Sequence, residues 1–183
     1  MSRDFIILDF ESIVADLSGC YAEAFSTAFR QFDIPYDGSL LEHYISTPLN
    51  VLFEKYYKGC TCKYRDFVIM FMGAFDASFN LSRPRPGIAD RVRKLKAEGA
   101  VLGIISECYE MYAHIFLSAN GIEECFSSVV GMDRAAIARP DPYVLRTCMG
   151  EMGADPGSTR MVSGSARDRE MCGKAGVPVS DSL

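Results

Sequence analysis

The sequence has no low-complexity tract, no cluster of lysine and arginine, and no apolar run long enough to cross a membrane. Its 183 residues are 49% hydrophobic and 23% charged, close to the averages of globular proteins, so we expect a packed core rather than disorder. This length suits one domain, or one domain with a modest insertion. The net charge of -5 argues against a general binder of nucleic acid or of anionic membranes, because phosphate backbones require clustered positive charge.

The start of the chain and its cysteines indicate the compartment. The charged segment Met1–Asp4 leads into an apolar run that ends at Asp9, which is too short for a signal peptide or a membrane span. The seven cysteines are scattered and odd in number, which favours free thiols over a disulfide framework. Cys60 and Cys62 form a C-x-C pair, but no second pair lies at the spacing of a zinc site. We therefore expect a soluble cytoplasmic protein.

The first part of the chain predicts one buried strand followed by helices. Phe5–Leu8 is a continuous apolar run of strand length, typical of a parallel strand buried on both faces. Apolar residues then recur at spacings of three and four, which predicts helices over Leu17–Phe32, Thr47–Tyr57 and Asp66–Phe79. No strand pattern occurs over residues 18–82, so we predict an all-helical insertion there.

Helices and strands alternate after the proline-rich hinge Arg83–Gly87. Each predicted helix is followed by a glycine that favours a helix end, and the helices are Ile88–Glu98, Tyr109–Asn120, Pro142–Met152 and Ala166–Ala175. The predicted strands are Val101–Ile105, Phe126–Val130, Arg160–Val162 and one that begins at Val177. Repeated β-α units predict an α/β fold with a mostly parallel, doubly wound, Rossmann-like sheet. Residues 1–17 and 83–183 would form this core.

Polar residues stand just after the predicted strands. In chain order they are Asp9, Glu11, Ser106, Arg139, Ser163, Gly164, Ser165 and Asp168. Ligands bind beyond the carboxyl ends of parallel strands, so we expect these residues to line one site. A carboxylate nucleophile, a second acid, a hydroxyl and a fixed cation suit group transfer through a covalent intermediate. Each residue alone has a simpler use, such as a turn cap at Asp9 or a helix cap at Ser106, so the hypothesis depends on their convergence.

Four segments resemble the motifs of the haloacid dehalogenase superfamily, α/β hydrolases that are mostly phosphatases. ILDFESIVADL is similar to an apolar strand followed by D-x-D-G-T/V, and GIIS resembles the end of the second motif. IARPDPYVL resembles the third motif, G-K-P-x-P, and VSGSARD resembles the fourth, h-h-G-D-x-x-x-D. The chain looks like the phosphoglycolate-phosphatase and β-phosphoglucomutase-like members, whose small helical cap closes over the site and would here be residues 18–82.

The resemblance implies an enzyme that hydrolyses small phosphorylated metabolites. Asp9 would attack the substrate phosphorus, and Glu11 would protonate the leaving group and later activate water. Ser106 and Arg139 would bind the phosphate. The other implied positions are the Mg²⁺ ligands Asp9, Glu11 and Asp168 and the site-lining residues Ser163, Gly164 and Ser165.

Several positions depart from the pattern of the family, among them Ser12, which follows Glu11 where glycine usually gives a tight turn. Glu11 replaces an Asp and is one methylene longer, and Arg139 replaces a Lys with a planar guanidinium. Gly164 stands where the family keeps an Asp that helps to bind Mg²⁺, which prefers anionic oxygen ligands. We therefore expect Mg²⁺ binding that is weak or absent, with slow phosphatase turnover or none.

Two alternatives follow from the same positions. The loss of the acid at Gly164 favours a catalytically inactive pseudo-hydrolase that acts as a binding protein. VSGSARD also resembles the V-S-x-N-x-x-D pattern of metal-free 2-haloacid dehalogenases. Against the dehalogenase, Ile13 stands where those enzymes keep a Thr, Glu11 where they have an uncharged residue, and the chain has no Trp for a halide pocket.

Overall fold

The chain folds into two compact units, as seen in a computed structural model that describes residues 4–183. Unit 1 consists of Met1–Asp16 with Pro84–Leu183, and unit 2 of Leu17–Arg83. The predicted core, residues 1–17 and 83–183, differs from unit 1 by one residue at each junction. Most of the charged start noted in the sequence, residues 1–3, lies outside the described residues.

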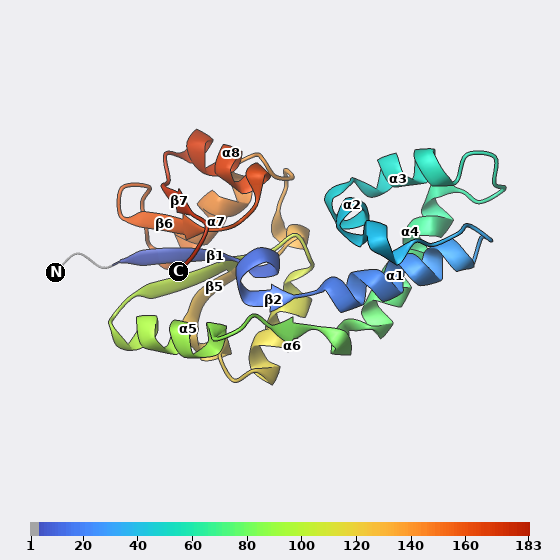
Figure 1. Ribbon diagram of the computed structural model, residues 1–183. Helices are drawn as coiled ribbons and strands as arrows, with labels where there is room; N and C mark the ends of the chain where they lie inside the picture. The colour runs from blue at the N-terminus through green and yellow to red at the C-terminus, as the bar shows by residue number, and fades with distance from the viewer. Residues whose placement is uncertain (1–3) are drawn as a thin grey trace. The chain divides into compact units, whose positions relative to one another are not determined.

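Unit 1 is built on a five-stranded parallel sheet in the order β5-β4-β1-β6-β7 (Figure 1). The strands are β1 (Phe5–Asp9), β4 (Val101–Ile105), β5 (Phe126–Val130), β6 (Thr159–Val162) and β7 (Val179–Ser180). The apolar run of β1 lies at the centre of the sheet, where Ile6, Ile7 and Leu8 are fully buried. The predicted α/β fold with a parallel sheet is confirmed.

Helices cover both faces of this sheet, with α7 and α8 on one side and α5 and α6 on the other (Figure 1). The helices of unit 1 are α5 (Ile88–Ala97), α6 (Glu110–Ala119), α7 (Tyr143–Met152) and α8 (Ala166–Ala175), and its 3-10 turns are η4 (Glu123–Cys125) and η5 (Met132–Arg134). The glycines predicted to follow the four helices, Gly99, Gly121, Gly153 and Gly176, all have positive φ. Since a side chain strains this conformation, glycine ends each helix there.

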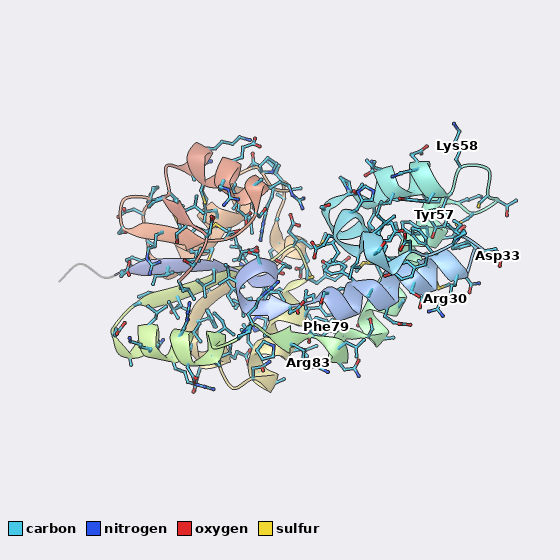
Figure 2. All side chains as sticks on the ribbon, viewed as in Figure 1. Arg30, Asp33, Tyr57, Lys58, Phe79 and Arg83 are labelled. Atoms are coloured by element: carbon cyan, nitrogen blue, oxygen red, sulfur yellow. The ribbon has the colours of Figure 1, made fainter. Side chains whose placement is uncertain are left out.

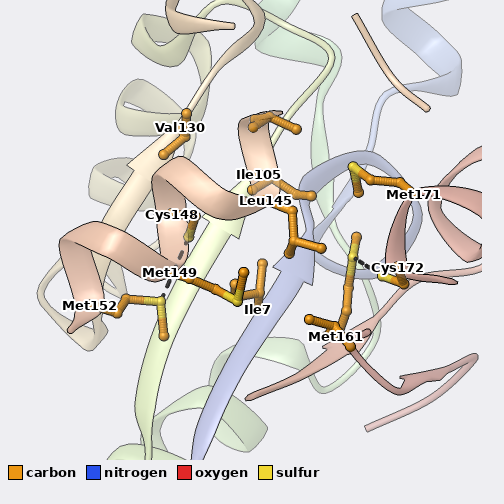
Figure 3. Packing of buried hydrophobic residues seen from close by; sticks show 12 residues of the cluster. Ile7, Ile105, Val130, Leu145, Cys148, Met149, Met152, Met161, Met171 and Cys172 are labelled. Carbon is orange, nitrogen blue, oxygen red and sulfur yellow. Dashed lines mark hydrogen bonds between the residues drawn. The ribbon is translucent and has the colours of Figure 1, made fainter. Parts of the chain in front are cut away.

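The core between the sheet and helices α7 and α8 is rich in sulfur (Figure 3). Its sulfur-containing side chains are Cys148, Met149, Met152, Met161, Met171 and Cys172. They pack against Ile7 of β1 and Ile105 of β4. Methionine is unbranched and flexible, so it fills the irregular space between helices and a twisted sheet. All seven cysteines are free thiols, and burial raises the pKa of Cys148 to about 12.

Gly103 in β4 faces two of these sulfur atoms. A Cβ added at this position would lie 2.5 Å from Met152 Sδ and 2.6 Å from Cys148 Sγ. We expect Gly103→Ala to lower the free energy of unfolding by about 1–3 kcal/mol, because the core has no space for another methyl group. Gly150→Ala in α7 is the matched control, since nothing lies within 4 Å of its added Cβ and alanine favours a helix. Urea unfolding measures both, and equal effects of the two substitutions would contradict this packing.

Unit 2 is all helical, and residues 18–82, which the structure describes throughout, contain no strand. Its helices are α1 (Ser18–Arg30), α2 (Leu41–Ser46), α3 (Leu49–Tyr56) and α4 (Tyr64–Ala77), and its 3-10 turns are η2 (Gly38–Leu40) and η3 (Phe79–Leu81). The sequence did not predict α2, whose six residues are too few to show a helical period. Aromatic rings fill the interior of unit 2, among them that of Tyr57, which is labelled in Figure 2. The Tyr57 hydroxyl donates a 2.9 Å hydrogen bond to the Ala28 carbonyl. Within residues 4–183 no helix is long and apolar enough to cross a membrane.

Three short elements escaped prediction. A π-helical turn, η1 (Phe10–Val14), directly follows β1, and the two-residue strands β2 (Ala15–Asp16) and β3 (Arg83–Pro84) pair with each other. Such short elements carry no hydrophobic period. The turn η1 places Glu11 and Ser12 directly after the end of the central strand.

Candidate active site

The residues that the sequence placed after the strands meet at one edge of the sheet of unit 1. Asp9 ends β1 and lies opposite Ile105 of β4, so Ser106 follows directly beside it. Ser163 follows Val162, the last residue of β6, on the other side of β1. Parallel register therefore brings side chains that are far apart in the sequence to one place, where ligand sites of such sheets lie.

Arg139 lies between two buried carboxylates. Its Nη1 donates hydrogen bonds to Asp9 Oδ1 at 2.7 Å and to the two oxygens of Asp168 at 3.1 and 3.2 Å. All three side chains are at most 6% exposed. Burial alone would lower the pKa of Arg139, but Asp9, Asp168 and Glu11 outweigh it and raise the pKa above its usual value. The guanidinium is therefore a permanent cation that neutralises part of the buried negative charge.

The second oxygen of Asp9 is held by Ser12. Asp9 Oδ2 accepts hydrogen bonds from the Ser12 backbone N–H at 2.9 Å and from the Ser12 hydroxyl at 2.6 Å. The same hydroxyl accepts a 3.2 Å hydrogen bond from the Gly164 N–H. Both oxygens of Asp9 are thus occupied by donors of the protein. Ser12 was not predicted as a site residue. Its presence in the turn after β1, where the family usually has glycine, was the available signal.

The segment after β6 fixes the position of Asp168. The Ser163 hydroxyl donates to Asp168 Oδ2 at 2.7 Å and accepts from the Ser165 N–H at 3.0 Å. Ser165 caps α8 by accepting a hydrogen bond from the Asp168 N–H. Burial raises the pKa of Asp168 even though Arg139 opposes this shift. Ser163 therefore contacts the Asp168 carboxylate, and Ser165 contacts the Asp168 backbone N–H. Gly164 contributes only its backbone N–H, which donates to Ser12.

Glu11 points toward the loop that follows β4. Its Oε1 accepts hydrogen bonds from the Ser106 hydroxyl at 2.6 Å and from the N–H groups of Glu107 and Cys108 at 2.9 and 3.1 Å. Burial, together with the charge of Asp9, raises the pKa of Glu11 to about 7. Arg85 donates a 3.1 Å hydrogen bond to the Glu11 carbonyl, a contact for which the sequence gave no signal. Ser106, predicted to bind phosphate, is thus engaged by Glu11.

The predicted Mg²⁺ ligands are not arranged as a metal site. Asp9 and Asp168 share the Arg139 guanidinium, and the Glu11 carboxylate is held by donors of the loop after β4. Gly164 provides no side-chain oxygen. Within the described part of the chain, no group of three His, Cys, Asp or Glu residues could hold a metal ion. Mg²⁺ requires near-octahedral oxygen ligands, so this donor set does not fit it.

Comparisons with known proteins agree with this architecture. A family model described as haloacid dehalogenase-like hydrolase matches residues 6–180. Phosphoglycolate phosphatase of Mesorhizobium japonicum is 31% identical over 98 residues, which cover 54% of this chain and 43% of that protein, so the match spans less than half of that relative. "Probable phosphatase IndB" of Dickeya dadantii is 25% identical over 185 residues, covering 96% of this chain and 79% of its own. A structure described as a "predicted phosphoglycolate phosphatase" from Haemophilus somnus has a TM-score of 0.85 at 19% identity, over 98% of this chain and 84% of that chain, and shows the same fold. The predicted family is confirmed, and the chain belongs to the haloacid dehalogenase-like hydrolases.

Proposed function

We propose that this protein is a phosphatase of small phosphorylated metabolites that works through an aspartyl-phosphate on Asp9. The observation that carries the proposal is the buried Asp9 carboxylate at the end of the central strand, with the Arg139 cation 2.7 Å from one of its oxygens. A carboxylate nucleophile needs such a cation to approach an anionic phosphate. The similarity to proteins named phosphatases supports the same reaction class.

The proposed reaction has two steps. An oxygen of Asp9 forms a bond to phosphorus while the bond to the leaving oxygen breaks, and Glu11 gives its proton to that oxygen. Glu11, now a carboxylate, then takes a proton from water as the water attacks phosphorus and releases Asp9 and inorganic phosphate. The pKa of Glu11, about 7, suits a group that must act as both acid and base near neutral pH.

The positive charge of the proposed site comes mainly from Arg139. Phosphatases of this family generally use Mg²⁺, but the donors described above do not fit it, and we propose that Mg²⁺ binds weakly or not at all. The carboxyl groups of Asp9, Glu11 and Asp168 then surround one cation, Arg139. This excess of negative charge repels an approaching phosphate and favours slow turnover. We also propose that unit 2 acts as the cap that selects the substrate.

The test is turnover of p-nitrophenyl phosphate with and without MgCl2, together with mass spectrometry of the protein. We expect slow hydrolysis and a phosphorylated Asp9 that hydroxylamine removes, both lost in Asp9→Asn. Asp90→Asn, which changes an exposed acid of α5 in the same way, should leave both unchanged. No hydrolysis and no phosphorylated Asp9 in the unaltered protein would reject the proposal.

One substitution tests the missing metal ligand. A Cβ at Gly164 would have Ser12 Cβ as its nearest neighbour at 3.8 Å, so a side chain fits there. We expect Gly164→Asp to raise the affinity for Mg²⁺ about tenfold, since affinity rises with the number of anionic ligands. Gly164→Asn is the matched control with the same shape and no charge. Calorimetric titration with MgCl2 compares them, and equal affinities would show that residue 164 does not face the metal position.

One observation favours the alternative of a catalytically inactive binding protein. Both oxygens of Asp9 and one oxygen of Glu11 are occupied by protein donors. If no phosphorylated Asp9 forms but phosphate still binds, a binding protein replaces the enzyme as the better proposal. The Ser163–Asp168 hydrogen bond is the observation that favours a metal-free dehalogenase, because both residues belong to the pattern of those enzymes. Release of chloride from 2-chloropropionate without Mg²⁺ would support that function.

A further inference from the structure

The Glu11 carboxylate occupies an anion cradle, which we define as the Ser106 hydroxyl and the backbone N–H groups of Glu107 and Cys108. All three donors point to a single oxygen, Glu11 Oε1, at 2.6, 2.9 and 3.1 Å. Convergent donors of this kind are suited to bind an oxyanion. In this structure the anion in the cradle belongs to the protein itself.

Capping of a helix does not explain this contact. Helix α6 begins at Glu110, after the cradle, and the Cys108 N–H already has a local acceptor in the Ser106 hydroxyl at 2.9 Å. Glu11 comes from a turn 95 residues earlier in the sequence. Its other oxygen, Oε2, is buried and has no hydrogen-bond partner among the residues that the structure describes. This unsatisfied oxygen costs free energy and so weakens the hold of the cradle on the Glu11 carboxylate.

The cradle lies within reach of the nucleophile. Asp9 and Ile105 are register partners on neighbouring strands, and the cradle starts at the residue after Ile105. An oxyanion bound in place of Glu11 Oε1 would therefore lie next to Asp9, whose charge the Arg139 cation offsets. The same place cannot hold the Glu11 carboxylate and a substrate oxyanion at once.

We propose that Glu11 is a displaceable internal ligand, which the tetrahedral oxyanion of the substrate must expel from the cradle before Asp9 can react. The inference rests on the proposed function, because the expelling group is the phosphate of the proposed substrate. Displacement frees the Glu11 carboxyl to meet the leaving oxygen, so binding of the correct group assembles the acid. A ligand without an oxyanion cannot compete for the three donors and leaves the site closed. The apparent Kd for phosphate equals the intrinsic Kd divided by the fraction of molecules in which the cradle is open, so a small open fraction weakens binding.

The experiment is calorimetric titration of the full chain with inorganic phosphate. We expect Glu11→Ala to bind phosphate about tenfold more tightly than the unaltered protein, since removing the internal ligand removes this competition. Glu98→Ala is the matched control, because it makes the same change at an exposed position that lies outside the cradle. We expect the phosphate affinity of this variant to change less than about threefold, since the Glu98 side chain is exposed and forms only a surface ion pair with Lys94. The double variant Glu11→Ala with Ser106→Ala should lose the gain.

Three results would overturn the inference. These are a Glu11→Ala variant that binds phosphate no more tightly than the unaltered protein, an equal gain in Glu98→Ala, and a gain that survives Ser106→Ala. If Glu11→Ala does not fold, Glu11→Gln replaces it, because a neutral amide competes less strongly for the cradle and should still tighten binding severalfold. Binding is measured without turnover, so a missing phosphorylated Asp9 would reject the proposed function and leave this result to be judged separately.

Discussion

Replacing Arg139 with alanine is expected to lower the free energy of unfolding by about 3–5 kcal/mol at pH 8. The variant leaves Asp9 and Asp168 buried without their shared cation, at side-chain exposures of 4% and 0%. Buried charges without partners are costly and avoid the cost by taking up protons. The loss should therefore be smaller at pH 5, because burial raises the pKa of Asp168 and favours its neutral form at lower pH. Urea unfolding at the two pH values measures the difference.

Two control variants test whether the loss of stability comes from the buried cation at position 139 and not from the removal of an arginine in general. The hydrogen bonds from the Arg139 side chain to Asp9 and Asp168 all come from Nη1, so an ammonium with three donors can replace them. Arg139→Lys should therefore keep most of the stability. Arg167→Ala breaks an exposed ion pair with Glu107 and should cost about 0–1 kcal/mol. Equal stability of Arg139→Ala and Arg139→Lys would show that a cation at this position does not stabilise the folded protein.

The stability of the unaltered protein is expected to fall by about 3 kcal/mol as the pH rises from 4.5 to above 7. The pKa of Glu11 is raised from its ordinary 4.5 to about 7, so the folded state binds more protons than the unfolded state between these values. Stability then decreases with pH across this interval, by about 1.4 kcal/mol for each pH unit that separates the folded and unfolded pKa values. The contribution is complete below pH 4.5 and is lost once Glu11 ionises in the folded state. The raised pKa of Asp168 acts in the same direction.

Glu11→Gln isolates the contribution of this residue. The amide oxygen can still accept from Ser106 and the two backbone N–H groups but cannot ionise, so the stability of this variant should vary less with pH by about 3 kcal/mol. Glu170→Gln, at an exposed position in α8, should keep the slope of the unaltered protein. Unfolding curves in urea from pH 4.5 to 8 give the comparison. An unchanged slope in Glu11→Gln would mean that Glu11 titrates as an ordinary carboxyl.

Local patterns in the sequence were sufficient for most of the fold. The predicted strands Val101–Ile105 and Phe126–Val130 have the bounds of β4 and β5, and the helix Ala166–Ala175 has those of α8. A continuous apolar run and a glycine after each helix are local signals that hold whatever the rest of the chain does. The two-residue strands β2 and β3 were missed because they are too short to show alternation. The six-residue helix α2 was missed because it spans less than two helical turns.

The sequence by itself determined which side chains stand at the carboxyl ends of the strands, because Asp9, Ser106 and Ser163 directly follow predicted parallel strands. Only the tertiary structure decided what those side chains bind. Arg139 lies between two acids, Ser12 holds the second oxygen of Asp9, and Glu11 reaches a loop 95 residues away in sequence. The physical reason is that a buried polar side chain takes the orientation that satisfies its hydrogen bonds. The partners that satisfy it come from distant segments, whose approach no local pattern in the chain encodes.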